Sequence, residues 1–339
     1  MALHRLLLGI FSLLIFAPGA FARGVELYAW SPGTTLAPLI IPVRASETPE
    51  QAAHRYLREL GKNPDLMELF EGRLPHLPSE NFKVLPEPDR ERRALMIANN
   101  PRALQPSYRP LRNLIHAFKQ QQNDSYILPM TADLGLSRAE TLDFFQQISE
   151  KFPLLVPMGG ADVDPHFYGQ QTVHARDLNP TRDQFELQLI KHYVAQEKGF
   201  VLGICRGSQL TAVALGYQLL QDVPYQKGSQ VPHANDWHPI QVHATTHNLL
   251  KDLAGSADQL RVNSLHHQSV VHKEGGPLEL AAQSADGITE ATEFKNGRGL
   301  LLQFHPELME NELGERILKR VIQQKNKVMR IRCGKAFGD

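Results

Sequence analysis

One cysteine of the sequence lies in a pattern that could make it a nucleophile. Cys205 follows the apolar run 200–204, and Gly203 and Gly207 lie two residues to either side of it. Small neighbours allow a sharp turn from a strand into a helix, which presents the side chain at the carboxyl end of a sheet. The start of the following helix would stabilise a thiolate. The alternative is a buried structural cysteine that packs as a small apolar side chain.

A histidine and a carboxylate could activate that thiol. His305 and Glu307 follow the apolar run 300–304 and are separated only by Pro306. A thiol nucleophile needs a base within hydrogen-bond reach, and the base needs a third group that orients it. These two residues could supply both groups from the end of one strand. An isolated His-Pro-Glu would more often place a surface histidine at a turn after a strand.

A glycine turn could complete such a site. The apolar run 154–157 is followed by Gly159 and Gly160, whose backbone N–H groups could face an oxyanion. The alternative is an ordinary turn, in which Asp162 and Asp164 hydrogen-bond to nearby backbone groups.

These residues need a scaffold, and the sequence predicts an α/β sheet from about residue 92. Apolar runs of strand length alternate there with segments of helical periodicity. Strands are expected at 94–98, 126–128, 154–157 and 200–204, and helices at 111–118, 137–148, 183–196 and 207–215. This alternation predicts a flavodoxin-like, mostly parallel sheet with helices on both faces. The range 239–304 is strand-like, and a last helix is expected at about 312–325.

The first residues resemble a secretory signal peptide. A short basic start precedes the apolar run 6–17, and Ala20-Phe21-Ala22 has the small-x-small form of a cleavage site. The apolar run is shorter than the about 20 residues that span a bilayer. We therefore expect residues 1–22 to be removed and the mature chain to be secreted or periplasmic, without a stable membrane anchor. The alternative is an uncleaved N-terminal anchor.

The ends of the mature chain are expected to be less regular than its centre. Residues 23–91 hold many prolines and predict an irregular N-terminal extension, with one helix after Thr48. Residues 92–325 would form the main domain, and residues 326–339 a basic C-terminal tail.

Composition narrows the possible functions. Lys plus Arg and Asp plus Glu both number 36, and this balance disfavours a nucleic-acid partner. The only cysteines are Cys205 and Cys333, and both are expected to be unpaired. Histidines are frequent between residues 233 and 272, but they match no His-Glu-x-x-His pattern and have no partner cysteines. The sequence therefore predicts no metal and no cofactor.

The three motifs occur in the order found in class I glutamine amidotransferase-like hydrolases. The sequence resembles the γ-glutamyl-γ-aminobutyrate hydrolase branch more closely, over about residues 92–325. Six ordered motifs carry this resemblance, at 159–169, 182–186, 203–209, 263–268, 286–291 and 303–307.

The resemblance implies a role for each matched residue. Cys205 would be the nucleophile, His305 the base and then the acid, and Glu307 the group that orients His305. Backbone N–H groups of Arg206, Gly159 and Gly160 would form the oxyanion hole. Residues expected to contact the substrate are Arg206, Gln209, His266, His267 and Gln268. For Arg206, which could bind a carboxylate bidentately, the alternative is a structural role at the start of a helix.

The predicted function is an exported hydrolase of small γ-glutamyl amides that acts through a γ-glutamyl thioester on Cys205. One alternative is a glutaminase subunit that passes ammonia to a synthase. Another is a non-catalytic binding protein on the same fold, because fold does not fix function. No pattern in the sequence indicates an oligomeric state.

Overall fold

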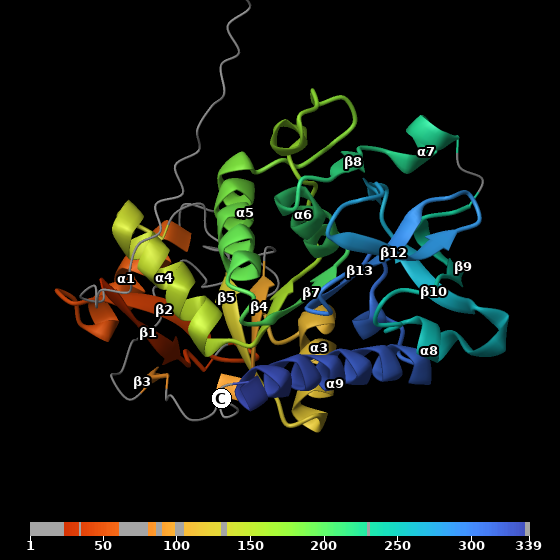
Figure 1. The fold of residues 1–339 in the computed structure, drawn as a ribbon. Helices are drawn as coiled ribbons and strands as arrows, with labels where there is room; N and C mark the ends of the chain where they lie inside the picture. The colour runs from red at the N-terminus through yellow and green to blue at the C-terminus, as the bar shows by residue number, and fades with distance from the viewer. Residues whose placement is uncertain are drawn as a thin grey trace, which may run out of the picture.

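A single twelve-stranded mixed sheet runs through the molecule (Figure 1). The structure, a computed structural model, describes residues 24–33, 35–60, 81–85, 90–98, 105–129, 134–228 and 231–335. The predicted signal peptide lies outside these residues. The strand order is β10-β9-β12-β13-β14-β7-β6-β4-β5-β2-β1-β3.

The centre of the sheet is parallel, as the sequence predicts. Its strands, in spatial order, are β14 (Gly299–Leu302), β7 (Phe200–Ile204), β6 (Leu154–Pro157), β4 (Arg93–Ala98), β5 (Asp124–Pro129) and β2 (Leu39–Arg44). Every residue of β14, β7, β6 and β4 is buried. Such continuous burial is typical of parallel strands with both faces covered.

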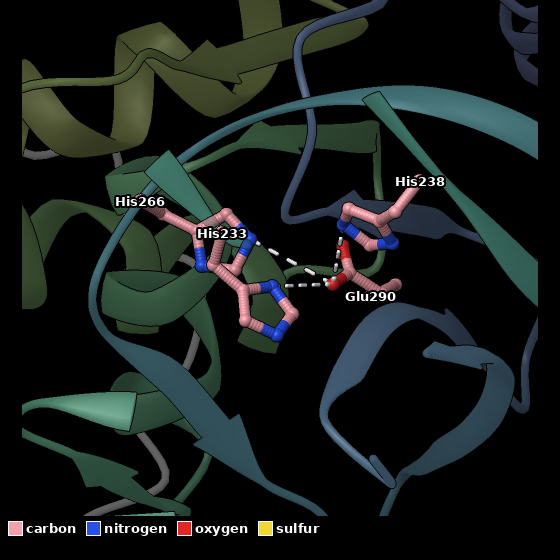
Figure 2. A group of neighbouring side chains, drawn as sticks. All are labelled: His233, His238, His266 and Glu290. Carbon is pink, nitrogen blue, oxygen red and sulfur yellow. Dashed lines mark ion pairs between the residues drawn. The ribbon is translucent and has the colours of Figure 1, made fainter. Parts of the chain in front are cut away.

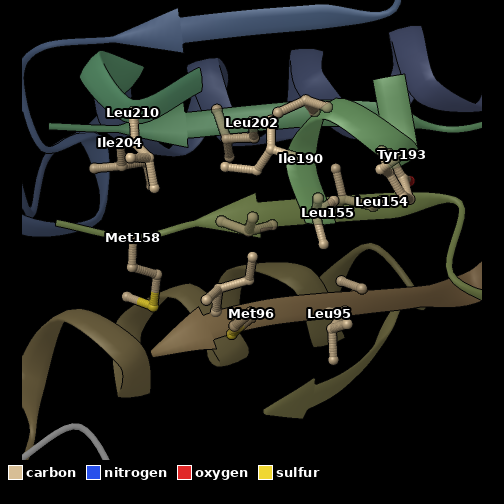
Figure 3. Close-up of a cluster of buried hydrophobic side chains, with 14 of the residues drawn as sticks. Leu95, Met96, Leu154, Leu155, Met158, Ile190, Tyr193, Leu202, Ile204 and Leu210 are labelled. Carbon is tan, nitrogen blue, oxygen red and sulfur yellow. The ribbon is translucent and has the colours of Figure 1, made fainter. Parts of the chain in front are cut away.

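Helices cover both faces of this parallel centre (Figure 1). One group consists of α4 (Arg138–Lys151), α5 (Pro180–Ala195) and α6 (Arg206–Ala214), and the other of α3 (Arg109–Gln120) and α9 (Glu312–Lys335). Figure 3 shows part of the apolar core around β4, β6 and β7, which includes Leu95, Leu155, Leu202, Ile190 and Leu210. Burial of each such side chain stabilises the fold by about 1.5–3 kcal/mol.

The N-terminal segment differs from the prediction of an irregular extension. Its described part contains β1 (Val25–Trp30), β2, α1 (Pro49–Leu60) and β3 (Phe82–Val84), and β1 pairs antiparallel with both β2 and β3. Leu27 and Trp30 are fully buried, so the apolar runs are strands of the main sheet. The prolines that suggested loops, at positions 64, 75, 78, 86 and 88, lie outside the described residues.

Antiparallel strands extend the other edge of the sheet. They are β13 (Thr289–Phe294), β12 (Leu278–Ser284), β9 (Ala234–Val242) and β10 (Gln259–Leu265). A separate two-stranded sheet pairs β8 (Gln218–Leu220) with β11 (Ser269–Val271). The short helices are α7 (Val223–Lys227) and α8 (Lys251–Ala254).

The last helix is longer than the sequence analysis expects. α9 continues to Lys335, so most of the predicted tail 326–339 is helical. Val321, Ile322 and Val328 are buried, and this apolar face explains why the helix continues past residue 325. The structure describes the backbone of Cys333 as part of α9 but not the position of its side chain. No helix within the described ranges is long and apolar enough to cross a membrane.

Candidate active site

Cys205 occupies a strained turn between β7 and α6. Its φ is 51° and its ψ is −114°, a conformation that residues with a side chain rarely adopt. A Cβ atom on Gly207 would lie 1.9 Å from the carbonyl oxygen of Pro157, and one on Gly203 would lie 2.8 Å from Cα of Ser208. Glycine is therefore required at both positions, and the predicted elbow is confirmed.

His305 lies between a carboxylate and the thiol. Its Nδ1 is 2.7 Å from Oε1 of Glu307. A Cβ atom on Gly159 would lie 2.9 Å from Cε1 of His305 and 3.5 Å from Cβ of Cys205, so the glycine turn, the imidazole and the cysteine meet at one place. Burial disfavours the imidazolium, but the Glu307 carboxylate and Cys205 outweigh burial and hold the pKa of His305 well above its usual range.

An asparagine that the sequence analysis gave no role fixes the backbone of His305. The side-chain amide of Asn263 donates to the carbonyl of His305, and its Oδ1 accepts the N–H of His305, both at 2.9 Å. Asn113 similarly donates to the carbonyl of Glu307 at 2.9 Å. Asn263 belongs to one of the six motifs, so its position was visible in the sequence, but its function depends on how β10 packs.

A chain of buried amides leads from the interior to the thiol. The Nε2 of Gln209 donates to the backbone carbonyl of Gln268 at 3.1 Å and to Oε1 of Gln303 at 3.0 Å. The Nε2 of Gln303 lies 3.8 Å from Sγ of Cys205. Gln209 and Gln268, for which a contact with substrate was expected, are 3% and 1% exposed, and in this structure their side chains hydrogen-bond within the protein interior.

The side chain of Arg206, expected to bind the substrate carboxylate, is bound by two carboxylates of the protein in this structure. Its guanidinium is 2.5 Å from Asp183 and 2.6 Å from Glu186, and Arg182 contacts Asp183 from the same helix at 3.0 Å. All four side chains are buried. Because α6 packs on α5, the first side chain of α6 turns toward α5 and away from the thiol. The backbone N–H of Arg206 remains in the first turn of α6, where N–H groups have no partner within the helix.

Of the two predicted histidine contacts, only His267 is accessible. Its Nε2 is 3.0 Å from Oδ1 of Asp162 and its Nδ1 is 3.3 Å from Oδ2 of Asp222. The hydrogen bond to Asp162 is the main cause that raises the pKa of His267, against the effect of burial. Asp162 lies three residues after Gly159, so His267 ties the glycine turn to the start of α7. His266, for which a contact with substrate was also expected, is buried and faces Glu290.

Tyr108, at the start of α3, is a further residue near the thiol. Burial, followed by the charges of Glu307 and Cys205, raises the pKa of its phenol. Tyr108 could not be predicted from the sequence because it lies in no motif and almost a hundred residues before Cys205.

The chain is similar in sequence to known proteins. The family model described as Peptidase C26 matches residues 132–307. The glutamine amidotransferase-like protein YvdE of Lactococcus lactis is 35% identical over 179 residues, which cover 51% of this chain and 72% of YvdE. Protein NtpR of Enterococcus hirae is 32% identical over 216 residues, which cover 60% of this chain and 83% of NtpR.

Solved structures of the same fold include the glutaminase domain of Trypanosoma brucei CTPS with bound acivicin. It superposes with a TM-score of 0.50 at 12% sequence identity and covers 69% of this chain and 93% of that domain. At this identity the likeness concerns the fold alone.

Proposed function

The chain belongs to the Peptidase C26 family, and on that premise we propose that it hydrolyses γ-glutamyl amide bonds through a thioester on Cys205. One observation carries the proposal. A cysteine held in a strained elbow lies beside His305, whose other nitrogen is 2.7 Å from Glu307. This arrangement supplies a nucleophile, a base and the group that orients the base.

In the proposed first step, Sγ of Cys205 attacks the γ-carbonyl carbon. The carbonyl oxygen becomes an oxyanion, which the backbone N–H groups of Arg206, Gly159 and Gly160 would stabilise; one such donor contributes about 3–4 kcal/mol in comparable enzymes. His305 then gives its proton to the amide nitrogen. The C–N bond breaks, the amine leaves, and the γ-glutamyl thioester remains.

In the second step, His305 takes a proton from water, and the resulting hydroxide attacks the thioester carbonyl. The C–S bond breaks, and glutamate and the thiolate are released. The raised pKa of His305 favours its imidazolium form at rest, so the proton for the departing amine is already in place.

Selectivity for the γ-glutamyl group must come from residues other than Arg206, because its guanidinium is bound to Asp183 and Glu186. His267 and Asp162 are the charged groups that the structure connects to the glycine turn. We propose that this pair contacts the α-amino and α-carboxylate groups of the substrate. The leaving amine would then be selected loosely.

Export remains part of the proposal and rests on residues 1–22. An apolar run followed by Ala20-Phe21-Ala22 is typical of a cleaved secretory signal. Mass spectrometry of the protein from its native source is expected to show a chain that begins near Arg23 and a location outside the cytoplasm. An intact Met1 on the native chain would contradict cleavage.

The experiment that tests the activity compares three anilides as substrates of the purified protein. A γ-glutamyl anilide carries both α-groups, a 4-aminobutyryl anilide lacks the α-carboxylate, and a glutaryl anilide lacks the α-amine. We expect rapid release of aniline only from the first, with a burst that reports the thioester. Hydrolysis that survives Cys205→Ala, or equal hydrolysis of all three anilides, would refute the proposal. Ammonia release confined to glutamine would instead favour the glutaminase alternative.

A further inference from the structure

Three histidines and a glutamate form a second buried group, on the antiparallel side of the sheet. Figure 2 shows His233, His238 and His266 directed at Glu290. The Oε1 of Glu290 is 3.4 Å from Nδ1 of His233, 3.5 Å from Nε2 of His238 and 3.7 Å from Nε2 of His266. One potential ligand atom from each of the four residues lies within 4.8 Å of all the others. We call these four residues the histidine–glutamate cluster.

In each histidine, the ring nitrogen that points away from Glu290, here called the outer nitrogen, has a hydrogen-bond partner. Nδ1 of His238 lies 3.3 Å from the carbonyl of Pro239, and Nδ1 of His266 lies 3.0 Å from the carbonyl of Gln268. Because a carbonyl can only accept, these nitrogens carry the proton, and the inner nitrogens present lone pairs when the rings are neutral. Nε2 of His233 is held by Asp286 at 3.1 Å. Histidines that bind metals are oriented in this way.

The inner atoms of the cluster are without hydrogen bonds in the described part of the chain. They are Nδ1 of His233, Nε2 of His238, Nε2 of His266 and both carboxylate oxygens of Glu290. The three histidines are 3%, 3% and 6% exposed, and Glu290 is fully buried. A buried polar atom without a partner costs about 1–3 kcal/mol, and an unpaired charge costs more. Lone pairs of three imidazoles that face a carboxylate would repel one another unless a cation or a shared proton lies between them.

The spacing fits a small tetrahedral ion. Bonds from zinc to histidine nitrogen or carboxylate oxygen are about 2.0–2.1 Å, which places tetrahedral ligand atoms about 3.3–3.4 Å apart. The three distances from Glu290 are 3.4–3.7 Å, close to this value. All four ligand atoms lie within 4.8 Å of one another, so the histidine nitrogens would draw together around a bound ion. Imidazole nitrogen with one carboxylate oxygen is a donor set suited to zinc and its neighbours in the first transition row.

We propose that the histidine–glutamate cluster binds one divalent transition-metal ion, of which zinc is the best match. Four protein ligands close the coordination sphere, so the ion has a structural function. It joins β9, which carries His238, and β13, which carries Glu290, to His266, the residue directly after β10.

The proposed ion is linked to the candidate active site through two short paths. His266 follows Asn263 along β10, and Asn263 holds the backbone of His305. The backbone carbonyl of Glu290 accepts the N–H of Gln303 at 2.8 Å, and the side chain of Gln303 approaches the thiol. The ion therefore acts on the catalytic groups only by fixing the strands that hold them.

Elemental analysis of the full-length protein, purified without chelators and loaded with zinc, tests the proposal. We expect about one ion per chain in the wild type, in Cys205→Ala and in His247→Gln, and less than a tenth of that in His238→Gln and Glu290→Gln. His247 is a matched control because it lies in the same region, outside the cluster, with Nε2 on the carbonyl of Lys295. Loss of the ion in Cys205→Ala would place it at the thiol and overturn the proposal.

A second measurement uses only the wild-type protein, so it does not depend on whether a variant folds. After removal of metal by a chelator, the wild-type protein is titrated with Co²⁺ and its visible absorption is recorded. A tetrahedral cobalt spectrum that saturates at one equivalent, together with a rise in Tm, supports the site. Metal-free protein that gains neither absorption nor Tm would overturn the proposal and would show that a proton shared among the histidines neutralises Glu290 instead.

Discussion

The candidate active site and the histidine–glutamate cluster are built in opposite ways, although Cys205, His305 and the whole cluster lie in the C-terminal half of the chain. Cys205 and His305 follow two neighbouring parallel strands, β7 and β14. The register of these strands places Leu302 beside Ile204 at their carboxyl ends. Carboxyl ends of parallel strands meet at one edge of a sheet, so motifs at those ends come together. The cluster instead gathers residues from an interstrand segment, from β9, from the end of β10 and from β13.

The difference teaches which kind of site a single sequence reveals. His305 and Glu307 are two residues apart, and each motif of the active site is short and contiguous. The four residues of the cluster span 58 positions, from 233 to 290, with no recurring interval. They meet only because the antiparallel strands adopt one register, in which His238 pairs with Val262. Spacing rules for metal motifs on one helix or hairpin cannot detect such a site.

The sharpest separation of the two sites is expected from Cys205→Ala. We expect turnover of the γ-glutamyl anilide to fall about 10⁴-fold or more, because residues of a catalytic triad act as a unit. Tm should be the same or higher, since the substitution removes no hydrogen bond that the fold requires. Steady-state kinetics and thermal melting measure both quantities. Cys333→Ala serves as the control and should leave turnover nearly unchanged; equal losses from both would contradict this assignment.

The next largest effect is expected from Glu307→Gln. Without the carboxylate, the pKa of His305 falls, so the alkaline limb of kcat/KM moves to lower pH, and kcat drops about 10²- to 10³-fold. The sign for stability follows from the same shift. Because the pKa of His305 is raised in the folded state, its protonation stabilises the fold. This contribution is fully present below the pKa of histidine in the unfolded chain, about 6.5, and is lost as pH rises through the pKa in the folded state. The variant should therefore lose stability mainly at acidic and neutral pH.

The control for Glu307→Gln is Glu310→Gln. Glu310 is exposed and forms an ion pair with Arg109, three residues beyond Glu307. Its substitution should leave the pH profile in place. A shift of the alkaline limb in Glu310→Gln as large as that in Glu307→Gln would argue against a direct effect on His305.

Arg206→Ala tests whether a residue beside the nucleophile is structural. The substitution leaves Asp183 and Glu186 buried without their main partner, so we expect a loss of about 3–5 kcal/mol in the free energy of unfolding. Urea denaturation measures it. Arg176→Ala is the matched control, because Arg176 is exposed and pairs with Asp222, and it should cost about 0–1 kcal/mol. A stable Arg206→Ala that loses affinity only for α-carboxylate substrates would restore the substrate-binding role.

The smallest of these effects is expected from Asn263→Ala, which breaks the link between the two sites. Both hydrogen bonds to the backbone of His305 are lost, so the imidazole should be held less well and kcat should fall about 10- to 100-fold. KM should change little, because Asn263 acts through His305. Loss of the cluster's metal in this variant would show that β10 couples the sites more strongly than the geometry suggests.

The fold and the catalytic motifs were predictable, whereas the directions of individual side chains were not. Alternating runs identified β4, β6, β7 and their helices, and the glycines around Cys205 identified the elbow. The apolar runs of β1 and β2 were visible too, but nothing local indicates that β2 pairs with β5 across almost ninety residues. Arg206 and Gln209 lie next to the nucleophile in sequence, and yet helix packing turns both toward the interior. Exposure of a polar side chain depends on such tertiary contacts.

The backbone conformation of Cys205 has a consequence for the evolution of related proteins. The φ of 51° and ψ of −114° suit glycine better than cysteine, and a residue with a side chain in such a region costs about 1–3 kcal/mol. The chain thus gives up stability at the one position where a thiol is wanted. In a related protein that is no longer selected for turnover, Cys205→Gly would increase stability. Glycine at position 205 is therefore the substitution expected in relatives that have lost catalytic activity.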